Sequence, residues 1–165
     1  MRTLTVLTIV FTFLRCPPIT AAPATRPATA PAVTAGKVGE RVESAGIAIT
    51  VVRVAHAPED KWKAIVHVAD DERYVDLELL IENNTGKILT YYPNLLKLKD
   101  DQDQEYGNDA LTGVGKALEF GSIPHGGKIR GHLSYTLSKA TKGLRLTYTL
   151  DGMEGYKPIY IDLGE

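Results

Sequence analysis

The sequence predicts an all-β fold for residues 38–165, either a sandwich or a barrel of antiparallel sheets. Apolar side chains in this region recur at every second position, which is typical of strands with one face in a core and the other in water. Clusters of Asn, Asp, Gly and Pro separate these runs and favour tight turns. No stretch has the periodicity of a long helix. Many short strands at this spacing favour antiparallel sheets packed around one core.

Four segments alternate most clearly and are expected to be strands: residues 74–82, 129–137, 144–150 and 159–163. In the first of them Asp76, Glu78 and Glu82 fall on the side opposite the apolar residues, so this side should face water. In the second, His132 and Ser134 fall on the solvent side in the same way. These strands would supply most of the core.

Six weaker strands are expected at residues 47–55, 63–69, 88–92, 95–99, 104–106 and 117–121. In the segment 47–55 the apolar positions change phase, from Ile47 and Ile49 to Val52 and Val54. A β-bulge inserts one residue into a strand and reverses the alternation beyond it. The sequence therefore predicts a bulge or bend near Val51.

The N-terminus has the features of an export signal. Arg2 gives a positive start and residues 3–14 are uncharged and largely apolar, a run too short to cross a bilayer as a helix. Small residues around Ala21 suit cleavage, so residues 1–21 are predicted to be a signal peptide. Cys16 leaves lipidation open as an alternative, although Arg15 directly before it suits that signal poorly. The expected location is the periplasm, the cell envelope or the medium, and membrane contact would occur only through an uncleaved or lipidated N-terminus.

Residues 22–37 are rich in Ala, Pro and Thr. Repeated prolines keep the chain extended and prevent helix formation, so this segment is predicted to be a disordered, semi-stiff linker. The domain would then comprise residues 38–165. If cleavage follows Ala21 this domain has no cysteine, and its core must hold it together without a disulfide.

The composition argues against nucleic acid as a partner. The net charge is −1, with 19 basic and 20 acidic residues, and no basic stripe follows any predicted strand. Binding to a phosphate backbone needs such a stripe of Lys and Arg. We expect no nucleic-acid binding.

Several motifs in order along the domain resemble the family called domain of unknown function 4352. They are residues 38–40 leading into 46–51, the strand 74–82 ending in Asn83-Asn84-Thr85, residues 96–100 followed by 104–106, and Ile123-Pro124-His125-Gly126-Gly127 before a strand. The resemblance implies an exported, immunoglobulin-like antiparallel β-sandwich of about seven to nine strands. It implies no activity, substrate or cofactor. Residues 59–72 and 107–116 depart from the family pattern.

Asn83-Asn84-Thr85 also matches the acceptor sequence for N-linked glycosylation. In an exported protein of bacterial type, this motif is expected instead to close the turn after the strand. Asn side chains favour such turns because they can bond to the backbone of nearby residues.

An acidic loop at residues 100–109 is the best candidate metal site. Its weak candidate ligands are Asp101, Asp103, Glu105 and Asp109, and calcium favours six to eight hard oxygen ligands of this kind. The spacing departs from an EF-hand, because Tyr106 stands where that loop needs glycine. A charged, solvated turn explains the cluster equally well. Calcium binding stays an alternative function, and no cofactor is expected.

No pattern of catalytic residues is evident, and we expect the chain not to be an enzyme. Ser44, Ser122, Ser134 and Ser138 lack the setting of a nucleophile elbow. The four histidines lack the short spacing of a zinc site. A small extracytoplasmic hydrolase stays a second alternative, which would require a pocket holding a nucleophile and a base.

Trp62, Tyr91 and Tyr92 form the candidate contact surface for a ligand or partner. Exposed aromatic rings on a sandwich commonly bind proteins, peptides or glycans. The competing explanation is that these rings close one end of the core. We interpret the chain as an exported, non-catalytic binding or scaffolding module whose ligand the sequence does not identify.

Overall fold

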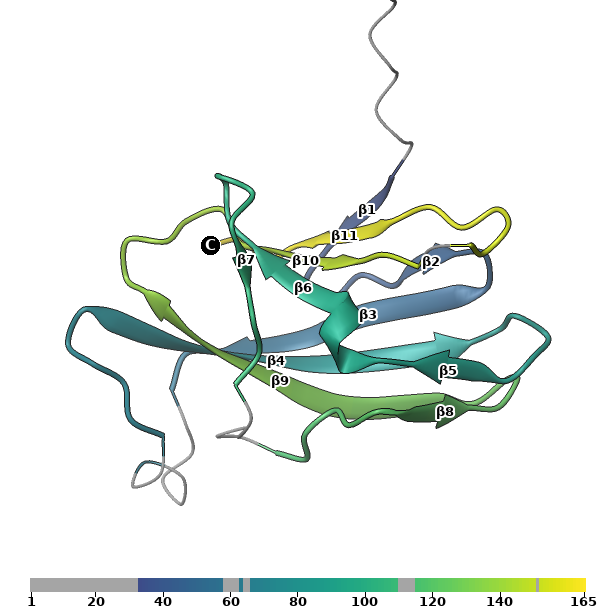
Figure 1. Cartoon of the computed structure of the whole chain (residues 1–165), viewed down its shortest axis with the longest axis horizontal. Coiled ribbons are helices and arrows are strands. Elements are labelled where there is room, and N and C mark those ends of the chain that lie inside the picture. Colours follow the sequence, from purple (N-terminus) through teal and green to yellow (C-terminus); the bar gives the residue numbers. More distant parts are fainter. Residues whose placement is uncertain (1–32, 58–62, 64–65, 110–114, 151) are drawn as a thin grey trace, which may run out of the picture. The chain divides into compact units, whose positions relative to one another are not determined.

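The two layers of a β-sandwich are visible in Figure 1, and the prediction of this fold class is confirmed. The structure is a computed structural model that describes residues 33–57, 63, 66–109, 115–150 and 152–165. Eleven strands lie within these residues, against an expectation of about seven to nine. The additional strands are short and have little or no apolar alternation in their sequence.

The strands form three sheets. The first has the order β1 (Thr34–Lys37), β11 (Ile159–Asp162), β10 (Arg145–Tyr148), β6 (Leu96–Lys99) and β7 (Glu105–Tyr106). The second has the order β2 (Val42–Ser44), β3 (Ile47–Ala55), β4 (Glu72–Asn83) and β9 (Lys128–Ser138). The third pairs β5 (Leu89–Tyr91) with β8 (Gly121–Ile123), and a short 3-10 turn, η2 (Pro93–Leu95), joins β5 to β6.

The core lies between the layers. β4 and β9 form the longest ladder, from Glu72 opposite Ser138 to Glu82 opposite Lys128. On β4 the predicted apolar set is fully buried, and it packs with inward-facing residues of β3, β6, β9, β10 and β11. Burying each side chain of this size contributes about 1.5–3 kcal/mol. The alternation in the sequence therefore identifies the core correctly.

The bulge in β3 is present where the sequence predicts it. Val51 pairs with Leu79 and Arg53 pairs with Glu78, so Val52 is the additional residue. One extra residue returns the apolar side chains of the second half of β3 to the core side.

The predicted linker and two predicted strands need correction. Residues 34–37 form β1, which pairs with β11 in parallel, so they belong to the sheet and not to the linker. Residues 66–69 form no strand but lead into a turn in which Ala69 O accepts a bond from Glu72 N. The strand expected at 117–121 lies instead at Gly121–Ile123, and Ala117 forms an isolated bridge to His132.

Asn83 occupies the corner where β4 ends, and its side chain is fully buried. Its Nδ2 donates to the carbonyl oxygens of Lys87 and Ile123, both at 2.7 Å. Its Oδ1 accepts bonds from the backbone N and Oγ1 of Thr85. The amide therefore uses its full bonding capacity, and it ties the ends of β5 and β8 to the β4–β9 ladder. This arrangement agrees with the turn-closing role expected of the Asn83-Asn84-Thr85 motif.

Replacing Asn83 with Ala should lower the free energy of unfolding by about 3 kcal/mol, because it removes four hydrogen bonds and leaves the buried carbonyl of Ile123 without this donor. Urea denaturation measures the change. Asn84→Ala is the matched control, since Asn84 is exposed and its backbone bond to Gly46 does not depend on the side chain. We expect that control to change stability by less than about 0.5 kcal/mol. Equal losses in the two variants would contradict this role for Asn83.

Two buried tyrosines on the long ladder differ in how their hydroxyls are satisfied. The hydroxyl of Tyr74 on β4 lies 2.9 Å from Ser134 Oγ. The hydroxyl of Tyr135 on β9 is buried and has no hydrogen-bond partner among the described residues. Burial raises the pKa of Tyr135 far above its ordinary value, so this phenol stays neutral.

Tyr135→Phe should leave stability unchanged or raise it by up to about 1 kcal/mol, because an unpaired buried hydroxyl contributes nothing favourable. Tyr74→Phe should lower stability by about 1 kcal/mol, since it breaks a made bond. Thermal and urea unfolding of both variants provide the comparison. A clear loss of stability in Tyr135→Phe would show that its hydroxyl has a partner.

Candidate functional site

The outer side of the β5–β8 sheet exposes large apolar side chains. On these strands Leu89, Tyr91 and Ile123 point into the core. The alternate positions therefore face outward. Three large side chains directly beside the strands are exposed: Ile88 at 72%, Tyr92 at 47% and Phe120 at 64%. Thr90 and Ser122, which are paired across the two strands, lie between them and are also exposed. We call these five residues the β5–β8 face.

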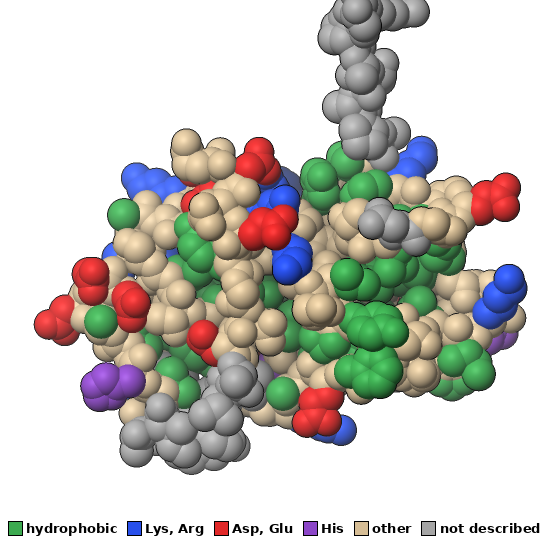
Figure 2. Space-filling view, in the orientation of Figure 1, with side chains coloured by type: hydrophobic (Ala, Val, Ile, Leu, Met, Phe, Trp, Pro, Cys, Tyr) green, Lys and Arg blue, Asp and Glu red, His purple; other side chains and the backbone are tan. Residues whose placement is uncertain are grey.

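Tyr92 and Phe120 form an aromatic pair at one end of this face. Their ring centroids lie 5.0 Å apart and the rings are tilted by 38°. Figure 2 shows hydrophobic side chains gathered on the surface over η2 and β5. The two rings thus contribute one continuous apolar area rather than two isolated contacts.

Tyr91 lies on the core side of β5, beneath this area, and is buried. Its assignment to the contact surface is therefore wrong. The competing explanation, that the ring closes one end of the core, applies to Tyr91. A Cβ on Gly121, its partner across the strands, would lie 2.9 Å from the Tyr91 hydroxyl oxygen, which explains the glycine there. Burial raises the pKa of the Tyr91 hydroxyl, and the nearby carboxylate of Glu119 raises it further.

Tyr92 is exposed as the predicted surface requires, whereas Trp62 lies outside the described residues. Sequence reasoning did not identify Ile88 and Phe120. Ile88 could have been found from its position, since it is four residues before Tyr92 and on the same side of the strand. Phe120 could not, because its contact with Tyr92 depends on a pairing between distant segments.

The acidic loop is held by contacts within the protein. Glu105 pairs with Lys99 at 2.8 Å, Asp103 pairs with Arg145, and Asp109 Oδ2 accepts a bond from Thr136 Oγ1 at 2.9 Å. Asp101 Oδ1 accepts a bond from its neighbour Gln102. No group of three or more His, Cys, Asp or Glu that could hold a metal ion occurs in the described part of the chain. The four candidate ligands therefore point to separate partners.

Asp100, which precedes these candidates, organises the same turn. Its Oδ1 accepts bonds from the backbone N of Gln102 and of Gln104, and its Oδ2 accepts the Tyr106 hydroxyl at 2.7 Å. The Tyr106 bond, followed by the backbone bonds, lowers the pKa of the Asp100 carboxyl. The negative charge thus has a structural role in this turn.

A buried polar cluster lies on the β4–β9 ladder, where the sequence predicts a solvent face. Asp76 is 1% exposed, and its Oδ1 accepts the Ser134 hydroxyl at 2.6 Å. Its Oδ2 lies 2.7 Å from His132 Nδ1. The predicted exposure of these side chains is wrong, since Asp76 and Ser134 are buried and His132 is largely covered. Gly115 packs against the His132 ring, where a Cβ would lie 2.5 Å from Nε2. Backbone hydrogen bonds from Asp109, Lys116 and Leu118 run along the free edge of β9.

This cluster has the residue types of a catalytic triad but not its arrangement. Ser134 and His132 both bond to the carboxylate, whereas a triad places the imidazole between the serine and the acid. Ser134 is also fully buried. The imidazole therefore does not accept the serine proton, and the cluster is a satisfied structural network.

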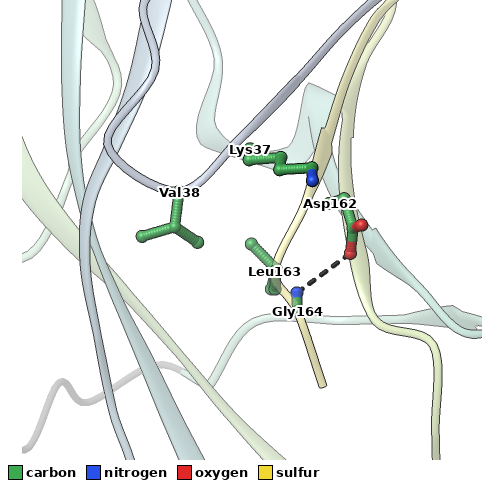
Figure 3. Close-up of a pocket in the computed structure, with 5 residues that line it drawn as sticks. All are labelled: Lys37, Val38, Asp162, Leu163 and Gly164. Carbon is green, nitrogen blue, oxygen red and sulfur yellow. Dashed lines mark hydrogen bonds between the residues drawn. The ribbon is translucent and has the colours of Figure 1, made fainter.

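A shallow pocket of about 190 Å³ lies between the ends of β1 and β11. Figure 3 shows its lining side chains, Lys37 and Val38 on one side and Asp162, Leu163 and Gly164 on the other. Asp162 Oδ1 is bonded to Gly164 N at 2.9 Å. Sites for small molecules are usually about 300–1,000 Å³ with several converging polar groups, so this pocket is a poor candidate.

The predicted signal peptide, Cys16 and residues 22–32 of the predicted linker also lie outside the described residues. Within the residues that the structure describes, no helix has the length and apolar composition needed to cross a bilayer.

A protein-family model matches residues 36–158 and is described as domain of unknown function DUF4352. The chain belongs to this family. The resemblance seen in the sequence is thereby confirmed, and the match to DUF4352 extends from β1 to the residue before β11. No curated protein has a sequence that matches this DUF4352 chain.

Solved structures with this fold come from several bacteria. The YjhA protein of Bacillus subtilis is 20% identical, with a TM-score of 0.58 over 78% of this chain and 98% of its own. The YcdA protein of the same species, a candidate lipoprotein, is 18% identical, with a TM-score of 0.57 over 74% of this chain and 38% of its own. The secreted protein MPT63 of Mycobacterium tuberculosis is 10% identical, with a TM-score of 0.54 over 79% of this chain and 98% of its own. At these identities the similarity establishes the fold.

Asp100→Asn should destabilise the DUF4352 domain at pH 7, and the difference from the unmutated chain should shrink as the pH falls below about 4. The folded state lowers the pKa of Asp100, so its stabilisation is present above the unfolded-state pKa and is lost as pH falls through the folded-state pKa. Urea midpoints at pH 7 and pH 3 measure both quantities. Asp101→Asn is the control, and a pH-independent effect of Asp100→Asn would exclude a role for its charge.

Proposed function

We propose that this chain is exported and acts outside the cytoplasm as a non-catalytic binding module whose contact surface is the β5–β8 face. The observation that carries the proposal is the exposed aromatic pair Tyr92–Phe120, together with Ile88 on the same face. A soluble protein gains nothing from holding such side chains in water. The two rings of the pair form one contiguous exposed apolar area, and such areas commonly mark sites of interaction.

The rigidity of the face supports the proposal. Asn83 joins the backbone at Lys87 to that at Ile123, so the start of β5 and the end of β8 are tied together. The buried ring of Tyr91 supports both strands from below. A surface that is already ordered loses little conformational entropy on binding, which favours affinity.

Export is supported by the leader-like residues 1–21 and by the proline-rich segment that follows them. Two solved structures with the same fold are described as a candidate lipoprotein and as a secreted protein, which fits the same location. The match to the candidate lipoprotein covers 38% of that protein, so a domain of this kind also occurs in a longer chain.

A binding role is favoured over the two alternatives. The acidic side chains of the loop 100–109 are engaged by Lys99, Arg145 and Thr136 within the domain, which argues against calcium binding. Among the described serines, Ser134 is buried with its hydroxyl committed to Asp76, and Ser44 Oγ accepts a bond from Lys157 N. These contacts argue against a serine hydrolase.

Site-specific photocrosslinking in the producing cell tests the proposal. A p-benzoylphenylalanine placed at Tyr92 or at Phe120 should form covalent adducts with an envelope component, because both side chains would lie within the contact. The same residue at Lys142, which is exposed at a turn between β9 and β10, is the control and should give no adduct. Gel shifts and mass spectrometry identify the products.

Two results would contradict the proposal. Equal crosslinking at position 142 and at positions 92 and 120 would remove the special role of the β5–β8 face. Recovery of the chain from the cytosol with Met1 intact would contradict export, and mass spectrometry of the same sample provides that measurement.

A further inference from the structure

We infer that the β5–β8 face binds a neutral glycan, which specifies the class of partner and rests on the proposed binding function. Three features of the face lead to this assignment: the limited area of its apolar side chains, the order in which apolar and hydroxyl groups alternate along it, and the charge of its outward residues.

The apolar area is small for a stable protein partner. At about 200 Å² for each side chain, the exposed fractions of Ile88, Tyr92 and Phe120 amount to roughly 350 Å². A standard protein interface takes roughly 450 Å² of apolar surface from each partner. The area on this face is also split, since Thr90 and Ser122 separate Ile88 from the aromatic pair. A ligand smaller than a folded protein matches this surface better.

The arrangement of groups matches the chemistry of a sugar chain. A pyranose presents a face of C–H groups surrounded by hydroxyls. The C–H face can lie on an aromatic ring, whose π surface is electron-rich. The side chains of Thr90 and Ser122 can exchange hydrogen bonds with sugar hydroxyls, and Ile88 offers a second apolar contact further along. If the extended geometry of β5 continues to its two neighbours, the chain from Ile88 to Tyr92 spans about 13 Å, which is the length of a short oligosaccharide.

The charge of the face favours a neutral glycan over an acidic one. None of its five outward residues is a cation. None of these five residues is an anion either, so the outward side chains of the face are uncharged. Such side chains provide no Coulombic attraction for a sulfated or uronic-acid chain, whereas the hydroxyls of Thr90 and Ser122 can exchange hydrogen bonds with neutral sugar hydroxyls.

The inference is tested with the full-length exported chain and three neutral probes: cellohexaose, chitohexaose and laminarihexaose. Isothermal titration measures the binding of each. We expect binding to at least one probe. Tyr92→Ala and Phe120→Ala should each weaken it by at least about tenfold, because each removes half of the aromatic surface. Tyr92→Phe should retain binding within about threefold, since the ring is preserved.

Lys142→Ala is the control for nonspecific effects, and thermal melting verifies that each variant is folded. Absence of binding to all three hexasaccharides, or binding that neither alanine variant weakens, would overturn the assignment of a neutral glycan. Photocrosslinks from positions 92 and 120 distinguish this failure from a failure of the proposed function. Adducts with another protein, or with a second copy of this chain, would support the proposed binding surface but contradict a glycan as its ligand.

Discussion

The side-chain amide of Asn83 is the constraint on which the arrangement of this sandwich depends most. It sits where the longest ladder ends and the chain reverses into the small β5–β8 sheet. This corner presents the buried carbonyl of Ile123, the part-buried carbonyl of Lys87, and the backbone N–H and hydroxyl of Thr85. An amide can satisfy all four, whereas a carboxylate has no donor and an aliphatic side chain has neither donor nor acceptor. The two strands that carry the exposed aromatic pair are therefore positioned by one residue outside the contact surface.

Regular alternation explains why much of the fold could be read from the sequence. β4 and β9 each alternate over many residues, so both their existence and their inward faces follow from the pattern. The bulge at Val52 is visible in the same way, as a change of phase. The strand β1 is different, because Thr-Ala-Gly-Lys has no apolar pattern and exists through backbone pairing with β11. The spacing of apolar residues within one segment does not indicate which distant segment it pairs with.

The same limit explains the errors at the candidate sites. Alternation requires that Tyr91 and Tyr92 face opposite sides, but which of them is buried depends on what packs beneath β5. Asp76, His132 and Ser134 fall on the side of their strands opposite the core, as the pattern says. That side is nevertheless covered, and only the tertiary structure reveals the cover. A polar residue on a strand thus marks the outer side of a sheet without establishing contact with water.

The backbone contacts of Asp109, Lys116 and Leu118 along the edge of β9 limit pairing between molecules at high protein concentration. β9 ends the second sheet, and an uncovered strand of this length would present a row of free N–H and C=O groups to any other extended chain. Here His132 exchanges backbone bonds with Lys116 and Leu118, and the carbonyl of Ser134 accepts a bond from Asp109. These bonds block the middle of the edge as a template for intermolecular pairing. Asp109, Lys116 and Leu118 thus occupy hydrogen-bonding groups of β9 that a second extended chain would otherwise need for pairing.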